Sequence, residues 1–179
     1  MNILETILQT AGGGAVETLA KNFGLNGSQV KDVMGQLVPA LSRGMQKNTQ
    51  QTEGLDSFIA AMKSGNHSRY MDQPGDLLQT NNIDDGNKIL GHLFGDKTVS
   101  REVANRAAGK TGVDSGIIKK MLPMLASLAM GAMSSQSAQS GITSSQSSGI
   151  GGLLSGFLDT DNDGSIADDL LGIAGKLLR

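Results

Sequence analysis

The sequence predicts an all-α fold, and three observations support this prediction. Aromatic residues make up only 3% of the 179 residues, so the core must be built from aliphatic side chains and nine methionines. Such a composition favours helices over strands. Apolar residues recur at intervals of three and four between Val30 and Leu41, which is helical spacing. Helix-breaking residues such as glycine and proline interrupt this pattern often, so we expect a bundle of about six or seven short helices.

The boundaries of these helices follow from glycine, proline and capping residues. Glycine ends helices, proline begins them, and Ser, Asn and Asp cap their first turns. Four stretches have this composition: GGG at 12–14, GLNGS at 24–28, KSGN at 63–66 and QPGD at 73–76.

An internal sequence repeat predicts two related helical-hairpin units within the bundle. Residues 20–37 and 108–125 align without a gap, so Gly24 corresponds to Gly112 and Leu37 to Leu125. The simplest explanation is that the two hairpins pack into one core, each covering the apolar face of the other.

The most apolar stretch is MLPMLASLAMGAM at residues 121–133. Because it is apolar on nearly all sides, it is either the central helix or a surface for a partner, and we favour the central helix. Pro123 is expected in the first turn of that helix, where a missing N–H costs least. The run of 13 residues is too short to span a membrane, which takes about 20.

Composition divides the chain into three parts. Residues 1–133 form the expected helical domain, residues 134–152 a linker, and residues 153–179 a short tail. The linker has no charged residue and consists mostly of Ser, Gly and Gln, which is typical of flexible coils.

The tail contains the most specific motif in the sequence. Asp159, Asp161, Asp163 and Gly164 match D-x-D-x-D-G, the first half of an EF-hand-type calcium loop. Alternate carboxylates converge on one point, glycine permits the sharp turn, and the carbonyl of Ser165 would add a ligand. The pattern predicts a calcium site followed by a C-terminal helix.

The end of this loop departs from the EF-hand pattern. Leu170 stands where a bidentate Glu belongs, so Asp168 or Asp169 would have to close the site. We therefore expect weak affinity, with a dissociation constant of about 10⁻⁵ to 10⁻³ M. The alternative is a helix capped by Ser165, which explains Asp168 and Asp169 but not the three alternating aspartates.

The two repeated hairpins also resemble a helix-turn-helix, and nucleic-acid binding is therefore an alternative function. The second hairpin and its surroundings carry the basic residues that phosphates would need: Arg101, Arg106, Lys110, Lys119 and Lys120. Before the tail, however, the chain has 13 basic and 12 acidic residues, whereas DNA-binding domains usually have a clear excess of positive charge. We therefore favour helix packing over nucleic-acid binding.

The sequence shows no pattern typical of an enzyme. The chain has no cysteine, and His67 and His92 are too far apart in sequence to suggest a site. His92 is expected to be a partly buried helix residue. Two stretches similar to phosphate-binding loops, at 104–111 and 91–98, follow no strand, so neither indicates nucleotide binding. Because the N-terminal stretch lacks a basic region and contains Glu5, we expect a cytoplasmic protein, although export without a signal remains open.

Three stretches together resemble a known family. DDGNKILGHLFGDKTVSREVA at residues 84–104, the apolar run at 121–133 and GLLSGFLDTDNDGSIADDLLGIAGKLL at 152–178 are similar to the bacterial domain-of-unknown-function family 937, which includes the YidB-like proteins. The resemblance implies an all-helical fold followed by a Gly/Ser-rich linker and an acidic motif. It implies no activity.

These observations predict a bacterial helical interaction module with a calcium-binding tail. A protein partner or self-association is expected, nucleic acid is the less favoured partner, and calcium is the expected cofactor. No catalytic residue and no membrane span are expected.

Overall fold

The computed structural model describes residues 7, 13–49, 52–64 and 66–139. Of these residues 88% lie in helices and none in a strand, which confirms the all-α prediction. The elements follow the chain in the order α2 (Gly14–Phe23), α3 (Gly27–Thr49), α4 (Thr52–Ser64), α5 (Arg69–Asp72), the 3-10 helix η1 (Pro74–Leu78), α6 (Thr80–Phe94), α7 (Lys97–Thr111) and α8 (Ser115–Gln139).

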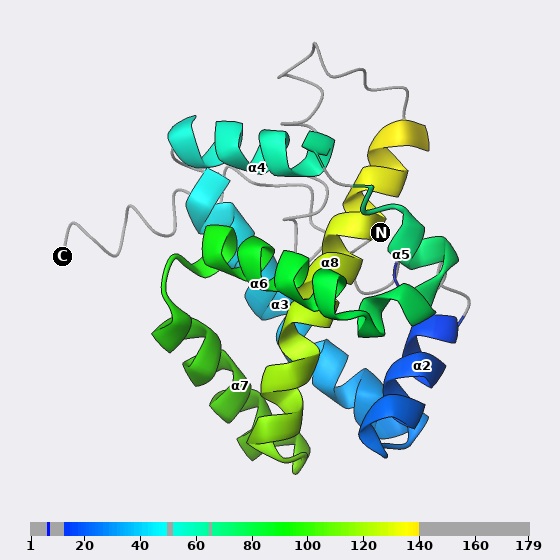
Figure 1. The fold of residues 1–179 in the computed structure, drawn as a ribbon. Coiled ribbons are helices and arrows are strands. Elements are labelled where there is room, and N and C mark those ends of the chain that lie inside the picture. The colour runs from blue at the N-terminus through cyan, green and yellow to red at the C-terminus, as the bar shows by residue number, and fades with distance from the viewer. Residues whose placement is uncertain (1–6, 8–12, 50–51, 65, 140–179) are drawn as a thin grey trace, which may run out of the picture.

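Helices α2–α3 and α7–α8 form the two related hairpins that the internal repeat predicts (Figure 1). In both, the first helix ends at a glycine in the left-handed region: Gly24 has a φ of 65° and Gly112 a φ of 71°. Each of these glycines donates its N–H to the carbonyl of an equivalent alanine, Ala20 or Ala108. The matching sequences therefore form matching turns.

The second helix of each hairpin begins at a capping side chain. Asn26 and Gln29 exchange two bonds, each backbone N–H donating to the other's side-chain oxygen at 2.9–3.0 Å. At the equivalent place Asp114 accepts from the N–H groups of Gly116 and Ile117, at 2.8 and 3.2 Å. Both caps satisfy backbone donors that no helical carbonyl can reach.

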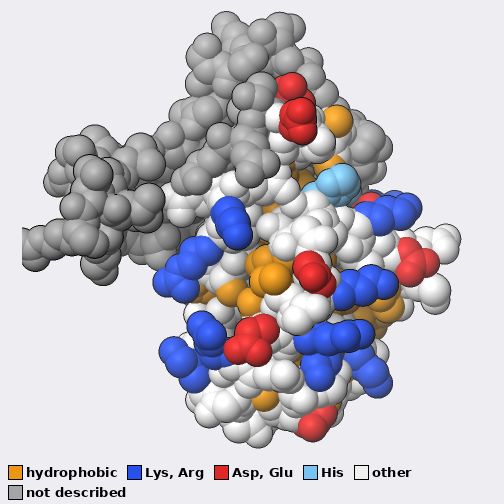
Figure 2. Space-filling model, turned by 90° about the vertical axis from the view of Figure 1, so that its left-hand side faces the viewer, with side chains coloured by type: hydrophobic (Ala, Val, Ile, Leu, Met, Phe, Trp, Pro, Cys, Tyr) orange, Lys and Arg blue, Asp and Glu red, His pale blue; other side chains and the backbone are white. Residues whose placement is uncertain are grey.

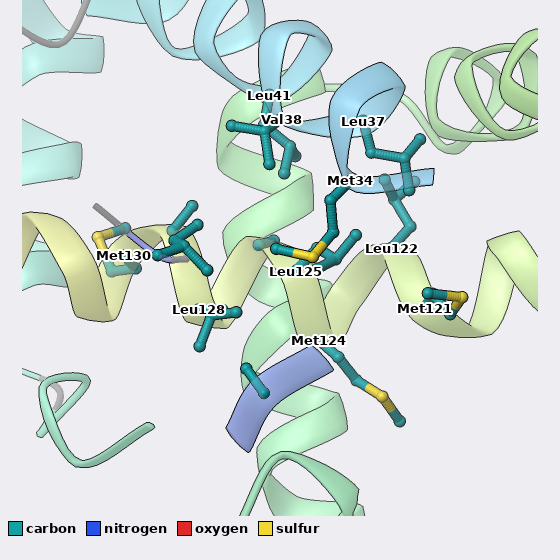
Figure 3. Close-up of a cluster of buried hydrophobic side chains, with 14 of the residues drawn as sticks. Met34, Leu37, Val38, Leu41, Met121, Leu122, Met124, Leu125, Leu128 and Met130 are labelled. Carbon is teal, nitrogen blue, oxygen red and sulfur yellow. The ribbon is translucent and has the colours of Figure 1, made fainter. Parts of the chain in front are cut away.

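Helix α8 is the centre of the bundle, with α3 and α6 packed along it (Figures 1 and 3). Every residue from Met121 to Met133 is buried, which confirms the prediction of a central helix. Leucines and methionines of α8 meet an apolar row on α3 that consists of Met34, Leu37, Val38 and Leu41. All seven methionines whose side chains the structure describes lie in this core.

Residues Ser115–Ser135 of α8 are long and apolar enough to cross a membrane by length and composition. Within that stretch, 78% of the most apolar window is buried inside the fold, as expected for the core helix of a bundle. No membrane span is therefore inferred among the described residues.

Two sequence-based expectations about α8 were wrong. Pro123 is the ninth residue of the helix instead of a member of its first turn, because Asp114 caps the helix well upstream. In that position proline leaves one carbonyl without its helical donor. The helix also continues to Gln139, so the first six residues of the expected linker belong to α8. The rest of the linker and the tail lie outside the described residues.

Glycines allow α6 and the segment around His67 to approach α8 closely. A Cβ on Gly86 of α6 would lie 2.6 Å from the carbonyl carbon of Pro123 and 2.9 Å from Ser127 Oγ. A Cβ on Gly131 of α8 would lie 2.5 Å from the carbonyl oxygen of His67. Real Cβ atoms do not come so close to backbone atoms, so these positions require glycine.

Candidate functional site

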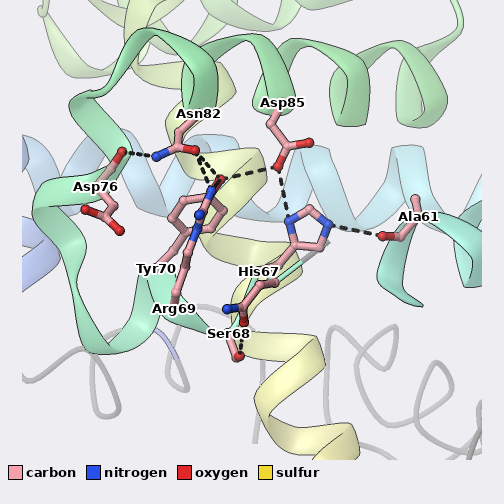
Figure 4. Close-up of polar contacts among 9 residues, drawn as sticks. Ala61, His67, Ser68, Arg69, Tyr70, Asp76, Asn82 and Asp85 are labelled. Carbon is pink, nitrogen blue, oxygen red and sulfur yellow. Dashed lines mark hydrogen bonds and ion pairs between the residues drawn. The ribbon is translucent and has the colours of Figure 1, made fainter. Parts of the chain in front are cut away.

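The first candidate site is a buried polar cluster around His67 (Figure 4). His67, which precedes α5, is only 3% exposed. Its Nδ1 lies 3.2 Å from Asp85 Oδ2 on α6, and its Nε2 lies 3.1 Å from the carbonyl oxygen of Ala61 on α4. Both partners are acceptors, and a neutral imidazole can donate to only one of them. His67 thus links α4 to α6 through its two ring nitrogens.

Tyr70 and Asn82 extend this cluster. The Tyr70 hydroxyl lies 3.1 Å from Asn82 Oδ1 and 3.3 Å from Asp85 Oδ2, and Arg69 donates to the same Asn82 oxygen at 2.5 Å. Asn82 in turn donates to the carbonyl of Asp76 at 2.6 Å. Burial raises the pKa of the Tyr70 phenol, and the bond to Tyr70 raises the pKa of the Arg69 guanidinium.

This cluster joins α4, α5, η1 and α6, and its geometry is structural. Both ring nitrogens of His67 already have partners, and the ring is buried, so neither nitrogen is open to a substrate. No local pattern in the sequence predicts this cluster, because its members come from four different elements. His92, in contrast, is exposed on α6, which corrects the expectation that it is partly buried.

The second candidate site is a groove between α3 and α7 that is also lined by the last residues of α6. It encloses about 670 Å³, which is within the range of ligand sites. Helix α3 contributes residues at helical spacing, Gln36, Ala40, Arg43, Gly44 and Lys47, and α6 contributes Leu93 and Phe94. The far wall is α7, with Thr98, Val99, Glu102, Val103, Arg106, Ala107 and Lys110.

The floor of the groove is apolar because of how α7 packs. The fully buried residues of α7 are the small ones, Ala104 and Ala107, so its larger Val99 and Val103 are left beside the groove. Val99 is 42% exposed, the most exposed large apolar side chain among the described residues. Gly44 leaves room for the Phe94 ring, since a Cβ there would lie 2.7 Å from it.

The rim of the groove is basic. Arg43 and Lys47 stand on α3 one turn apart, and Arg106 and Lys110 have the same spacing on α7. Glu102 is the acid on the lining, and its carboxylate pairs with Arg106 at 3.5 Å while both side chains remain mostly exposed. Lysine and arginine side chains lie on either side of a patch of hydrophobic atoms on this face of the molecule, with acidic side chains among them (Figure 2).

The position of α7 is fixed at both ends by its caps. Asp96 accepts from the backbone N–H of Thr98 at 2.7 Å, and this bond lowers the pKa of its carboxyl. Gly112 ends the helix. A capped and packed helix can present the rim cations from a fixed backbone, which reduces the ordering cost of binding.

The structure brings together part of the predicted basic set. Arg106 and Lys110 line the groove, Arg101 lies exposed elsewhere on α7, and Lys119 and Lys120 are exposed on the first turns of α8. Arg43 and Lys47 were not among the predicted residues, and they lie more than 50 residues upstream of their counterparts. Their i, i+4 spacing opposite an apolar face was the available signal.

The predicted calcium ligands, Asp159, Asp161, Asp163, Ser165, Asp168 and Asp169, lie outside the described residues. Within the part of the chain that the structure describes, no three His, Asp or Glu side chains are grouped so that they could hold a metal ion.

Comparison with known proteins gives one match. A family model described as a bacterial protein of unknown function (DUF937) matches residues 5–136, which include all of the helices up to most of α8. No curated protein and no solved structure matches the chain.

Proposed function

Because the chain belongs to the bacterial family of unknown function DUF937, whose description carries no activity, we propose a function from its own geometry. The protein is an interaction module that binds an acidic, partly apolar peptide segment in the groove between α3 and α7. It acts by binding and not by catalysis. The observation that carries this proposal is the combination of an apolar floor and a basic rim in one groove.

The floor favours a peptide over a nucleic-acid backbone. Leu93, Phe94, Val99 and Val103 offer apolar surface, which side chains of a peptide can cover and phosphates cannot. The cations in turn select acidic residues on the peptide and speed its association at low salt.

Fluorescence anisotropy with the full chain tests this proposal. The probe is a short labelled peptide with leucines on one helical face and aspartates on the other, and the comparison peptide carries lysines instead of the aspartates. We expect the acidic peptide alone to bind, and salt to weaken it. The double variant Lys47→Glu, Lys110→Glu should weaken binding at least about tenfold, which corresponds to about 1.4 kcal/mol.

A matched control keeps the same change in net charge. Lys31 and Lys88 are exposed and do not line the groove, so Lys31→Glu, Lys88→Glu should leave the affinity nearly unchanged. Equal losses in both double variants would reduce the effect to net charge and refute the proposal. A DNA duplex that binds more tightly than the acidic peptide, and loses affinity in the groove variant, would favour nucleic-acid binding instead.

Calcium binding by the tail is the second part of the proposal. Its support is the spacing of Asp159, Asp161 and Asp163 before Gly164, because oxygen ligands at alternate positions are what calcium requires. Ser165 would add its carbonyl, and Asp168 or Asp169 would close the site. Isothermal titration of the wild type against Asp161→Ala, Asp163→Ala tests it. No heat in the wild type up to millimolar calcium, or equal heat in both, would leave the capped helix as the better interpretation.

A further inference from the structure

We infer that the resident occupant of the α3–α7 groove is the C-terminal tail of the same chain, residues 153–179. This inference rests on the proposed function, since it names the acidic peptide that the groove takes. Three independent properties of the chain support it: charge, apolar content and reach.

The charges of the two partners are complementary. The groove lining carries Arg43, Lys47, Arg106 and Lys110 against Glu102, a net charge of +3. The tail carries five aspartates between positions 159 and 169 against Lys176 and Arg179, a net charge of −3. No other stretch of eleven residues in the sequence holds as many acids without a basic residue. Opposite fields of this kind steer association and fix its orientation.

The apolar residues of the tail match the floor of the groove. Phe157 and Leu158 precede the aspartates, and Leu170 and Leu171 follow them. The lining of α7 runs from Thr98 to Lys110, which at 1.5 Å per residue is about 18 Å of helix. A segment that carries acids in its middle and apolar residues at both ends can place each against its counterpart over such a length.

The chain between α8 and the tail is long enough to reach the groove. Thirteen residues separate Gln139, the last residue of α8, from Leu153. At about 3.3–3.6 Å per residue they can span at most about 45 Å, whereas a domain of this size has a radius of gyration of about 14 Å. A tether of this length gives an effective concentration of the order of millimolar, so even weak contacts would keep the groove occupied.

Paramagnetic NMR on the full chain tests the inference, and the absence of cysteine makes the labelling simple. A nitroxide on Ser155→Cys reports which backbone amides lie near the tail. EDTA in the buffer keeps the aspartates free of calcium. We expect amides of the groove, among them Gly44, Val99 and Val103, to be broadened, and amides of α2 to stay sharp.

The charge variants identify the cause of any broadening. In Lys47→Glu, Lys110→Glu the broadening should be lost, and in Lys31→Glu, Lys88→Glu it should remain. Added salt of about 0.5 M should reduce it, because the Debye length falls to a few ångströms. Core amides that keep their shifts in all variants show that the fold is intact. Broadening that survives in the groove variant would overturn the inference.

A mixed sample decides between the same chain and a second copy. Isotope-labelled chains without nitroxide are mixed with unlabelled chains that carry it, and the same-chain arrangement predicts sharp groove signals. Broadening of the groove signals in the mixture would assign the groove to the tail of a second copy and refute the inference. If the groove binds the added acidic peptide while the tail label leaves its amides sharp, the inference fails and the proposed function stands. If neither binds, both fail.

Discussion

Hairpins α2–α3 and α7–α8 are built from matching residues up to the middle of their second helices and then diverge. Val30 and Ile118 are both fully buried, as are Leu37 and Leu125. From Met124 to Met133, α8 stays buried on all sides, whereas the matching part of α3, from Gln36 to Met45, lines the groove with one side. Position by position, the pairs that diverge are Gln36 and Met124, Ala40 and Leu128, and Arg43 and Gly131.

This difference shows where the groove comes from. Helix α3, the second helix of the first hairpin, lines the groove with its polar side. Helix α7, the first helix of the second hairpin, forms the opposite wall. The residues of α8 that correspond to Gln36, Ala40 and Arg43 are buried in the core. In the second hairpin, α8 thus serves packing alone. In the first hairpin, α3 keeps part of its surface available for binding.

The largest expected effect tests the shared half of the hairpins. Leu37→Ala and Leu125→Ala should each lower the free energy of unfolding by about 2–5 kcal/mol, because both side chains are fully buried at equivalent positions. Urea denaturation monitored by circular dichroism measures both losses. A loss below about 0.5 kcal/mol at either position would mean that its helix is not part of a common core.

The divergent half predicts the opposite behaviour at equivalent positions. Ala40 lines the open groove, so Ala40→Leu, which installs the residue found at the equivalent Leu128, should change stability by no more than about 0.5 kcal/mol. In contrast, Leu128→Ala should cost about 2–5 kcal/mol. Similar losses from both variants would show that α3 is packed as tightly as α8.

A smaller effect is expected where α6 crosses α8. Gly86→Ala should cost about 1–3 kcal/mol, since the added Cβ meets the Pro123 backbone. The matched control is Gly35→Ala, at the position of α3 equivalent to Pro123, where a Cβ meets nothing within 4 Å. That variant should gain up to about 1 kcal/mol from helix propensity. Thermal melts of the pair measure the difference, and a tolerated Gly86→Ala would contradict the close crossing.

The caps of the two second helices should contribute equally. Asn26→Ala and Asp114→Ala each remove a side-chain acceptor from a first turn, at a cost of about 0.5–2 kcal/mol. Chemical denaturation should give losses that agree within about 0.5 kcal/mol. A loss in one hairpin only would mean that the two turns are not equivalent.

The smallest expected effect is a pH dependence of stability that distinguishes α7 from α2, the first helices of the two hairpins. Helix α7 is capped by Asp96, whereas the residue before α2 is Gly13, which has no side chain to cap the helix. Because the bond from Thr98 lowers the pKa of Asp96, its carboxylate stabilises the fold above the ordinary Asp pKa of about 3.9, and this contribution is lost as pH falls through the lowered value. The melting temperature of Asp96→Ala should approach that of the wild type below that pH, and a difference that persists there would contradict this origin.

The sequence predicts the fold of this protein well because local signals determine it. The breakers around Gly24 and Gly112, the capping residues after them and the apolar run at 121–133 each act within a few residues, so the hairpins and the central helix could be inferred. The position of Pro123 could not, because Asp114 starts the helix earlier than the apolar pattern does.

The groove and the His67 cluster could not be predicted for a different reason. Both depend on residues that are distant in sequence: Lys47 faces residues of α7, and His67 meets Asp85 and Ala61 on two other helices. Periodicity shows which side of a helix is polar but not which helix lies opposite. The basic residues of α7 were therefore identified without the partners on α3 that make them a site.

The methionine-rich core also determines how the protein would respond to oxidants. Met34, Met121 and the five other buried methionines are shielded while the bundle is closed. Oxidation to the sulfoxide makes such a side chain polar, and a polar group in this core has no partner to bond. Opening of the bundle would expose several methionines together, so oxidative damage would follow unfolding and then prevent refolding until a reductase restored the thioethers.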